Sequence, residues 1–501
     1  MAFIRKVTTA SGATAVQIAH KVHGHIVRIE HIGSAHTDAE LALLVSLAKQ
    51  RLQGAQQSLF TEPEDTVHGM KIGLKQSFSD VLWQCLTLQY QRLGFDQLAD
   101  EHFKYLCLAR LVEPTSKLDS IRVLQDLGVG GVSKSGLHRC LKRIVAKDYR
   151  DKLAKLCFAH ASQGAGITLV LYDVTTLYFE IQKEDEPDGD NHGYRKSGMS
   201  KERRLEPQVI VGLLVDQNGF PLELHSFKGN KAETKTILPV LEAFKKRHGL
   251  VGLTVVADAG MLSAKNLKEL TGAGYTYIVG SRMNKIPYAI AEYQQTQQEL
   301  TDKQIIAAKT DIPGQRIIYQ YREKRAKLDL RNIAKQIEKA EKIIAGKTAV
   351  KKAKFLTVTA NTKQTKVLNQ TLIDKATSLA GIKGYVTNLP KTAASNERVI
   401  AYYHELWHVE QSFRMSKYDL KARPIFHHKQ EAIEAHLTVV MAALAVGRTI
   451  EQQAGMSMAM FVKTVRPLRS GVITLNGQDH SIEPEIPLSV APLVRRMRTG
   501  H

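Results

Sequence analysis

The sequence is poor in cysteine: only four occur among 501 residues, with no CxxC pair and no histidine at ligand spacing. Neither a structural zinc site nor a disulfide framework is expected, so the thiols are predicted to be reduced and buried. Proline (14) and tryptophan (2) are also rare, whereas 43% apolar and 24% charged residues are typical of globular chains. This composition disfavours disordered, collagen-like and coiled-coil architectures. The four cysteines are Cys85, Cys107, Cys140 and Cys157.

Long apolar runs are missing as well. The longest, 209–215 and 437–446, are much shorter than the roughly 18–20 residues of a membrane helix. The first residues, MAFIRKVTTASG, have neither the apolar stretch nor the small-residue cleavage site of a secretory signal. The sequence therefore predicts a cytoplasmic protein without a membrane-spanning segment.

Acidic residues are outnumbered, because 49 Asp and Glu face 70 Lys and Arg, which gives a net charge of +21 and a pI of about 9.6. Such an excess attracts polyanions and favours release of counterions from nucleic-acid phosphates. The expected partner is therefore DNA or RNA. At this length the chain is expected to hold about three domains.

The first 160 residues divide into two patterns. Residues 1–60 alternate apolar and polar side chains before a helical pattern at 38–53, which predicts a small β-rich subdomain followed by a helix. In residues 61–160 the apolar spacing changes to three and four, which predicts a mainly helical region.

Two predicted helices of this region, 116–127 and 134–146, have the order of a helix-turn-helix. A Gly-rich segment separates them, and Ser133 is placed to cap the second helix. We predict that the second helix contacts DNA, although a plain solvated helical hairpin has the same pattern. The predicted DNA contacts are Lys134, Arg139, Lys142 and Arg143.

At residue 167 the pattern changes to buried strands, in the order βββαβαβ, which predicts a mixed sheet with helices packed on its faces. The catalytic core is expected at 165–283 and 381–450. The expected strands are 167–173, 209–215, 222–227, 253–257 and 275–280, with helices at 231–247 and 263–272, a further strand at 384–388 and one long helix over 396–418.

Residues 284–380 interrupt this pattern and are predicted to form a basic inserted domain. Segment 321–354 holds 12 Lys and Arg against 4 Asp and Glu, in a helical pattern. One-signed charge favours an arm that faces nucleic acid, and a solvated helix face is the alternative. The C-terminal region, 451–501, is expected to serve protein–protein contacts.

Carboxylates follow two of the predicted strands. Asp173 and Asp258 each end a buried run, so they are expected to converge where Mg²⁺ or Mn²⁺ finds oxygen ligands. Glu410, on the long predicted helix, is the candidate third ligand. At about 100° per residue it shares a stripe with an aromatic hydroxyl and two cations suited to phosphates, although a surface salt-bridge ladder has the same spacing. The stripe is Tyr403, Leu406, Glu410, Arg414 and Lys417.

Histidines lie near this helix, and they raise the alternative of a zinc site. With no paired cysteine and no HExxH motif, helix capping or phosphate contact is the expected role. The histidines are His427, His428 and His436.

Four segments together resemble the catalytic blocks of bacterial insertion-sequence DDE transposases: LYDVTTLYFE (171–180), VVADAGMLS (255–263), YIVG (277–280) and YHELWHVEQSFRMSK (403–417). The last block is similar to the family's Tyr-x2-Arg-x3-Glu-x6-Lys signature. It departs from that signature at Leu406, where the family has Arg, and so resembles the subgroup with Leu-Trp there. HGYRKSGMSKERRLEPQ (192–208) and KGNKAETKT (228–236) resemble the family as well.

This resemblance implies an α/β chain with a ribonuclease H-like mixed-sheet catalytic core, an inserted domain and a mainly helical N-terminal DNA-binding region. It implies two Mg²⁺ or Mn²⁺ ions held by Asp173, Asp258 and Glu410, with Asp173 bridging both. Double-stranded DNA, as terminal inverted repeats and target, would be cut and joined by a homodimer in the synaptic complex. Phosphate contacts are expected from Tyr403, Arg414 and Lys417.

Two other functions remain open at this point. A metal-dependent nuclease of the same fold would cut DNA without strand transfer, and its site would contain the same residues. A catalytically inactive DNA-binding protein would keep the basic helices and lose a carboxylate, but all three carboxylates are present.

Overall fold

The structure is a computed structural model, and it divides into two compact units. Unit 1 comprises Met1–Gly166, Val174–Lys231 and Val409–His501, and unit 2 comprises Ile167–Asp173 and Ala232–His408. The residues described are 2–9, 12–22, 25–53, 72–163, 166–186, 193–199, 204–261, 263–281, 283, 286–296, 299–310, 312–347, 352–358, 366–475 and 477–499.

Unit 2 is built on a mixed sheet with the strand order β10-β11-β14-β9-β8-β5. The pairs β5–β8 and β8–β9 are parallel, and the other pairs of this order are antiparallel. The strands are β5 (Leu169–Tyr178, which continues into unit 1), β8 (Thr254–Ala257), β9 (Thr276–Ser281), β10 (Ile305–Lys309), β11 (Arg316–Tyr321) and β14 (Ile382–Thr387).

The helices of unit 2 follow the predicted periodicity. In α7 (Ile237–His248) the side chains at 237, 240, 241 and 244 are buried, which is one helical stripe. α8 (Ala264–Gly272) begins after Ser263, whose hydroxyl accepts from the Asn266 backbone N–H at 3.2 Å. α12 (Asn396–His404) packs against β8, β9 and β14. The unit also contains η2 (Glu233–Lys235) and α9 (Tyr288–Gln295).

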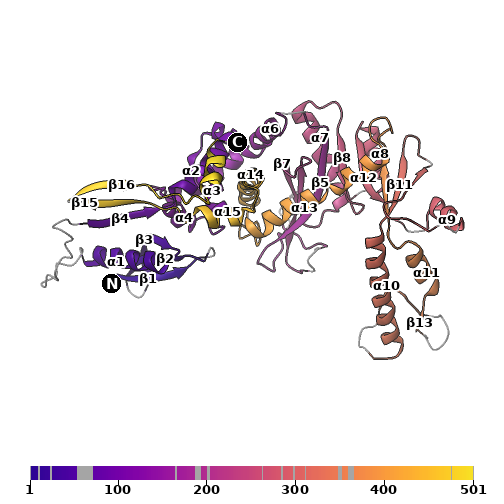
Figure 1. The fold of residues 1–501 in the computed structure, drawn as a ribbon, viewed down its shortest axis with the longest axis horizontal. Helices are drawn as coiled ribbons and strands as arrows, with labels where there is room; N and C mark the ends of the chain where they lie inside the picture. The colour runs from indigo at the N-terminus through magenta and orange to yellow at the C-terminus, as the bar shows by residue number, and fades with distance from the viewer. Residues whose placement is uncertain are drawn as a thin grey trace. The chain divides into compact units, whose positions relative to one another are not determined.

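Part of the segment predicted as an inserted domain extends the sheet, because β10 pairs with β11 and β11 pairs with β14. The rest forms an arm in which α10 (Glu323–Ile344) contacts α11 (Gln370–Ser378) and β13 (Lys366–Leu368), and β13 pairs with β12 (Leu356–Val358). Figure 1 shows α10 running away from the sheet with α11 beside it. The arm is therefore helical where the apolar periodicity predicted a helix.

Unit 1 begins with the antiparallel sheet predicted for the N-terminal residues. Its strands β1 (Ala2–Thr8), β2 (Thr14–Val22) and β3 (His25–Ala35) pair in that order, and α1 (Asp38–Gln53) contacts all three. Val16, Ile18 and Ile32 of the sheet pack against Leu44 and Ala48 of the helix. Residues 54–60 of the predicted subdomain lie outside the described residues.

Helices form the centre of unit 1, around α14 (Gln430–Ala454), which contacts α2, α3, α5, α6, α15 and α16. By length and composition α14 is apolar enough to cross a membrane, but 89% of its apolar window is buried inside the protein. The four cysteines are buried, as predicted. The surrounding helices are α2 (Asp80–Arg92), η1 (Phe95–Leu98), α3 (Glu101–Val112), α4 (Ser120–Asp126), α5 (Lys134–Ala146), α6 (Tyr149–Ala161), α15 (Met458–Val465) and α16 (Ala491–Thr499).

Two further sets of strands complete unit 1. β6 (Gln208–Val215) and β7 (Pro221–Lys228) are antiparallel neighbours next to β5. β15 (Ser470–Leu475) lies between β16 (Gln478–Ile482) and β4 (Ile72–Phe78), so the C-terminal region pairs with a strand that precedes the helices. The apolar spacing of 61–160 predicted a helical region and did not reveal β4. This strand is stabilised by pairing with β15, which lies about 400 residues away along the chain, and a local pattern contains no information on such a partner.

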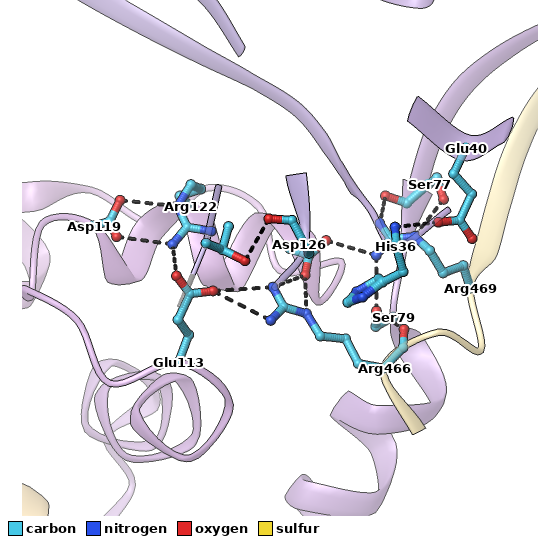
Figure 2. A network of polar contacts seen from close by, with 12 residues as sticks. His36, Glu40, Ser77, Ser79, Glu113, Asp119, Arg122, Asp126, Arg466 and Arg469 are labelled. Atoms are coloured by element: carbon cyan, nitrogen blue, oxygen red, sulfur yellow. Dashed lines mark hydrogen bonds and ion pairs between the residues drawn. The ribbon is translucent and has the colours of Figure 1, made fainter. Parts of the chain in front are cut away.

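A buried ionic network joins the C-terminal region to α4 and to Glu113, the residue that follows α3 (Figure 2). The Arg466 side chain is 1% exposed and donates to Asp126 at 2.7 and 2.9 Å and to Glu113 at 3.4 Å. Arg469 donates to the other oxygen of Asp126 at 2.9 Å, and Arg122 pairs with Glu113. The C-terminal arginines are therefore part of the core of unit 1, in addition to any role in protein contacts.

The single long helix predicted over 396–418 is wrong. α12 ends at His404, a turn occupies 405–406, α13 spans Trp407–Arg414, and the π-helix η3 spans Met415–Asp419. At the break the backbone N–H of Leu406 donates to Tyr403 O and that of His408 to Glu405 O, which are three-residue turns. No proline or glycine marks this position, so the local sequence contains no signal for the break.

Candidate active site

Asp173 lies within β5, and Asp258 directly follows the neighbouring parallel strand β8. In the register of β5 and β8, Tyr172 is the partner of Ala257, and each aspartate is the next residue. Neighbouring strands lie roughly 4.8 Å apart, and side chains at matched positions of a parallel pair point to the same face. Asp173 and Asp258 therefore each come directly after the last paired residues of this parallel ladder, at the end where β8 finishes.

Buried apolar residues precede both aspartates. Val170, Leu171 and Tyr172 are fully buried on β5, as are Val255 and Val256 on β8. Asp258 then stands at the start of a turn, in which the Met261 N–H donates to the Asp258 carbonyl at 3.1 Å. Asp258 is exposed and Asp173 is half-buried.

Tyr403 contacts Asp258 directly. Its side chain is 5% exposed, and its hydroxyl donates to Asp258 Oδ1 at 2.9 Å. α12 carries it there because Val399, Ile400 and Tyr403 form the buried face of the helix, which begins at the Ser395 cap. A phosphate contact was predicted for Tyr403, whereas the structure uses its one hydroxyl proton on an aspartate.

Three residues surround the Tyr403 ring, and none was singled out as a site residue from the sequence. Tyr385 meets the ring edge-on, with centroids 5.0 Å apart, and Lys383 Nζ lies 4.4 Å from its centroid. Gly280, the cross-strand partner of Tyr385, faces the hydroxyl: a Cβ built there would lie 2.7 Å from Tyr403 Oη. The YIVG segment pointed to Gly280 only as part of the family resemblance.

Glu410 is placed by α13 in unit 1. The inward side of this helix is fixed by Val409, which is fully buried, and by Ser412, whose hydroxyl donates to Gly219 O at 2.7 Å. Glu410 and Arg414 are exposed on the helix, and Lys417 is half-buried on η3. Tyr403 and Leu406 are buried, so the five predicted stripe residues do not share one exposed face. The reason is the break at 405–406, which changes the helical phase.

The predicted recognition helix α5 spans Lys134–Ala146, and Ser133 caps it as expected, accepting from the Gly136 N–H at 3.1 Å. Lys134, Arg139 and Lys142 are exposed along it. These three predicted DNA contacts are therefore accessible.

Arg143, predicted as a fourth DNA contact, has an internal partner instead. It donates two hydrogen bonds of 2.8 Å to Asp100, the residue that caps α3. Burial alone would raise the pKa of Asp100, but the bonds from Arg143 and Tyr149 lower it. Arg143 thus fastens α5 to the start of α3.

The histidines near α14 are engaged in internal contacts. His427 Nε2 lies 2.6 Å from Lys117 Nζ, and burial lowers the pKa of His427 to about 4. His436 is buried, with Nε2 3.0 Å from Ala422 O, and His428 Nδ1 lies 3.1 Å from an Arg195 nitrogen. Among the described residues no group of three or more His, Cys, Asp or Glu side chains forms a ready metal site.

Residues 164–446, more than half of the chain, match the family model described as the transposase DDE domain. The chain belongs to the DDE transposase family. This membership indicates an enzyme that acts on DNA, and the matched segment includes Asp173 and Asp258 of unit 2 together with α13.

Comparison of the DDE transposase chain with curated protein sequences finds no match. Among solved structures it is similar to the piggyBac transposase synaptic complex with hairpin DNA, at 9% identity and a TM-score of 0.36. That similarity covers 86% of this chain and 77% of the other.

Proposed function

We propose that this DDE transposase cuts DNA at the ends of an insertion sequence and transfers the strand to target DNA, using a ribonuclease H-like core. The observation that supports the proposal is the register of β5 and β8 in a chain of this family, because the residues just before Asp173 and Asp258 are cross-strand partners. The subgroup with Leu-Trp in the last motif is the proposed relative within the bacterial insertion-sequence transposases.

The donor set suits a hard divalent cation, because Asp173 and Asp258 offer carboxylate oxygens at matched positions and Asp258 is exposed. These two residues would hold Mg²⁺ or Mn²⁺, with Glu410 proposed as third ligand from the motif spacing alone. Two bound ions would activate the attacking hydroxyl and stabilise the leaving oxygen of an in-line phosphodiester displacement. No side chain is required as a covalent nucleophile, so one site serves both cutting and joining.

DNA would be held by basic surfaces outside the carboxylates. On α5, Arg139 and Lys142 are exposed within one turn of each other. On α10, Arg331, Lys335 and Lys339 are exposed at four-residue spacing, and none of the three forms an ion pair with a described residue. Exposed cations in rows neutralise phosphates without needing a base sequence.

Arg414 and Lys417 are proposed to hold phosphates of the scissile strand. A residue that positions this strand affects the reaction more than overall affinity, since affinity is shared among many phosphates. Leu406, where the family has Arg, is 7% exposed. Arginine there would bring a charge into a largely buried position, whereas Arg414 is exposed on α13.

The test uses Asp173→Ala, Asp258→Ala and Glu410→Ala with duplexes carrying the inverted repeats that flank the gene. Each variant should lose cleavage and joining by on the order of 10³-fold or more, with nearly unchanged gel-shift affinity, because a ligand to the reacting centre is removed. Asp374→Ala, an exposed carboxylate on α11, is the matched control and should cut normally.

Three outcomes would contradict parts of the proposal. Strong Mg²⁺-dependent cutting by one alanine variant removes that residue from the site. Cutting by the wild type without joining identifies a nuclease of the same fold. End binding by the wild type without cutting, in both Mg²⁺ and Mn²⁺, identifies an inactive DNA-binding protein.

A further inference from the structure

We propose that Tyr403 is a positioning residue for Asp258, and that Gly280 is required to leave room for its hydroxyl. The bond from Tyr403 Oη to Asp258 Oδ1 is 2.9 Å long, and the donor is buried while the acceptor is exposed. The catalytic meaning of this bond rests on the proposed function. The bond itself is a property of unit 2 and can be tested separately.

The Tyr403 hydroxyl has little freedom to do anything else. A tyrosine hydroxyl has one proton, and this one is donated to Asp258, so it cannot also be donated to a DNA phosphate. Tyr385 packs against the ring edge, and Lys383 lies over the ring face. Together these contacts hold the hydroxyl at one point beside the carboxylate.

The consequence for Asp258 is a fixed orientation. This residue follows the end of β8 and begins a turn, so the strand ladder does not hold its side chain. The bond to Oδ1 stops rotation of the carboxylate and leaves Oδ2 for a ligand. Hydrogen bonds to ligating carboxylates are worth about 10- to 100-fold in metal affinity or activity, which sets the expected effect.

Gly280 supplies the second, independent observation. A Cβ at this position of β9 would lie 2.7 Å from Tyr403 Oη, 3.3 Å from its Cζ and 3.2 Å from the Ala259 Cβ. The tyrosine oxygen is the end of a rigid ring already packed on two sides, so it could not move without losing the bond to Asp258. Gly280 therefore maintains the position of Tyr403, although it does not touch the carboxylate.

The experiment compares Tyr403→Phe, Gly280→Ala and the double variant in the full chain. Mn²⁺ binding without DNA is measured by calorimetry, and thermal unfolding and DNA cleavage are measured in parallel. Tyr403→Phe should bind Mn²⁺ about 10- to 100-fold more weakly, and higher Mn²⁺ should restore cutting. Tyr402→Phe, at the neighbouring position of α12, is the matched control and should behave as wild type.

Gly280→Ala should lower both the unfolding temperature and Mn²⁺ affinity. Phenylalanine lacks the oxygen that the new Cβ would meet at 2.7 Å. Gly280→Ala should therefore lower the unfolding temperature by less in the Tyr403→Phe background than in the wild type. In the Asp258→Ala background, Tyr403→Phe should leave Mn²⁺ binding unchanged, because the residue it positions is absent.

Wild-type Mn²⁺ affinity in Tyr403→Phe would overturn the proposal. So would a loss of DNA affinity in Tyr403→Phe with unchanged Mn²⁺ binding, since that result assigns the hydroxyl to a phosphate. Additive losses of unfolding temperature in the double variant would show that Gly280 does not maintain the position of Tyr403. Failure of the proposed function is recognised separately, by Asp258→Ala that still cuts DNA.

Discussion

Asp258 in unit 2 and Asp126 in unit 1 show two opposite environments for the same carboxylate. Asp126 has a fully buried side chain that receives three hydrogen bonds from the guanidinium groups of Arg466 and Arg469. Asp258 is exposed and accepts one bond from a neutral hydroxyl. Burial alone would raise the pKa of Asp126, but Arg469 and Arg466 hold it below the ordinary value.

The difference shows what makes a carboxylate available. At Asp126 both oxygens are occupied by cations of the protein, so its charge stabilises the fold and no ligand can reach it. At Asp258 a neutral donor fixes the direction of the group without neutralising its charge. The interactions of a strongly paired, buried aspartate thus contribute to the free energy of folding. An exposed aspartate with a single hydrogen bond can instead contribute to the free energy of ligand binding.

Matched asparagine substitutions at the two aspartates should give the largest effects and the sharpest test. Asp258→Asn should reduce DNA cleavage by on the order of 10³-fold with an unchanged unfolding free energy. Asp126→Asn should cost about 3–5 kcal/mol of unfolding free energy, because two buried guanidinium groups lose their charged partner. Urea denaturation and a cleavage assay on both variants check this. Equal stability losses would contradict the comparison.

The same contrast applies to cations of α5 and predicts an intermediate effect. Reversing Arg139 and Lys142 to Glu should weaken end binding by roughly tenfold or more and lower the salt dependence of binding, since exposed cations meet phosphates. Arg143→Ala should lower the unfolding temperature and leave the salt slope unchanged, because Arg143 is paired with Asp100. Gel shifts at several salt concentrations separate the two outcomes. An unchanged affinity of the double reversal would remove α5 from DNA binding.

The smallest expected effect is a pH dependence of unit 1 stability. Burial lowers the pKa of His31 to about 4, and its ring nitrogens have no hydrogen-bond partner among the described residues. Between about pH 6.5 and 4 the unfolded chain therefore binds more protons at this histidine than the folded chain does. The unfolding free energy should fall as the pH is lowered through this window. His31→Leu should flatten the fall in urea titrations, and an unchanged slope would assign the effect to other groups.

The candidate site was predictable to the extent that it depends on runs of neighbouring residues. The buried strands that carry or precede Asp173 and Asp258 could be identified from apolar residues followed by a carboxylate, although β5 continues to Tyr178 and does not end at Asp173 as predicted. α5 could be identified from its periodicity and its Ser133 cap. The predicted boundaries of α5 agree with the structure because capping and periodicity are local properties of the chain.

What the sequence by itself determined was therefore the composition of these elements: buried strands with an aspartate after the apolar run, a capped basic helix and a large positive charge. Only the tertiary structure decided that Tyr403 donates to Asp258, that Arg143 pairs with Asp100, and that the helix breaks at 405–406. The physical reason is that a side chain's partner depends on which distant segment packs beside it. Tyr403 and Asp258 are 145 residues apart, and no local pattern records that contact.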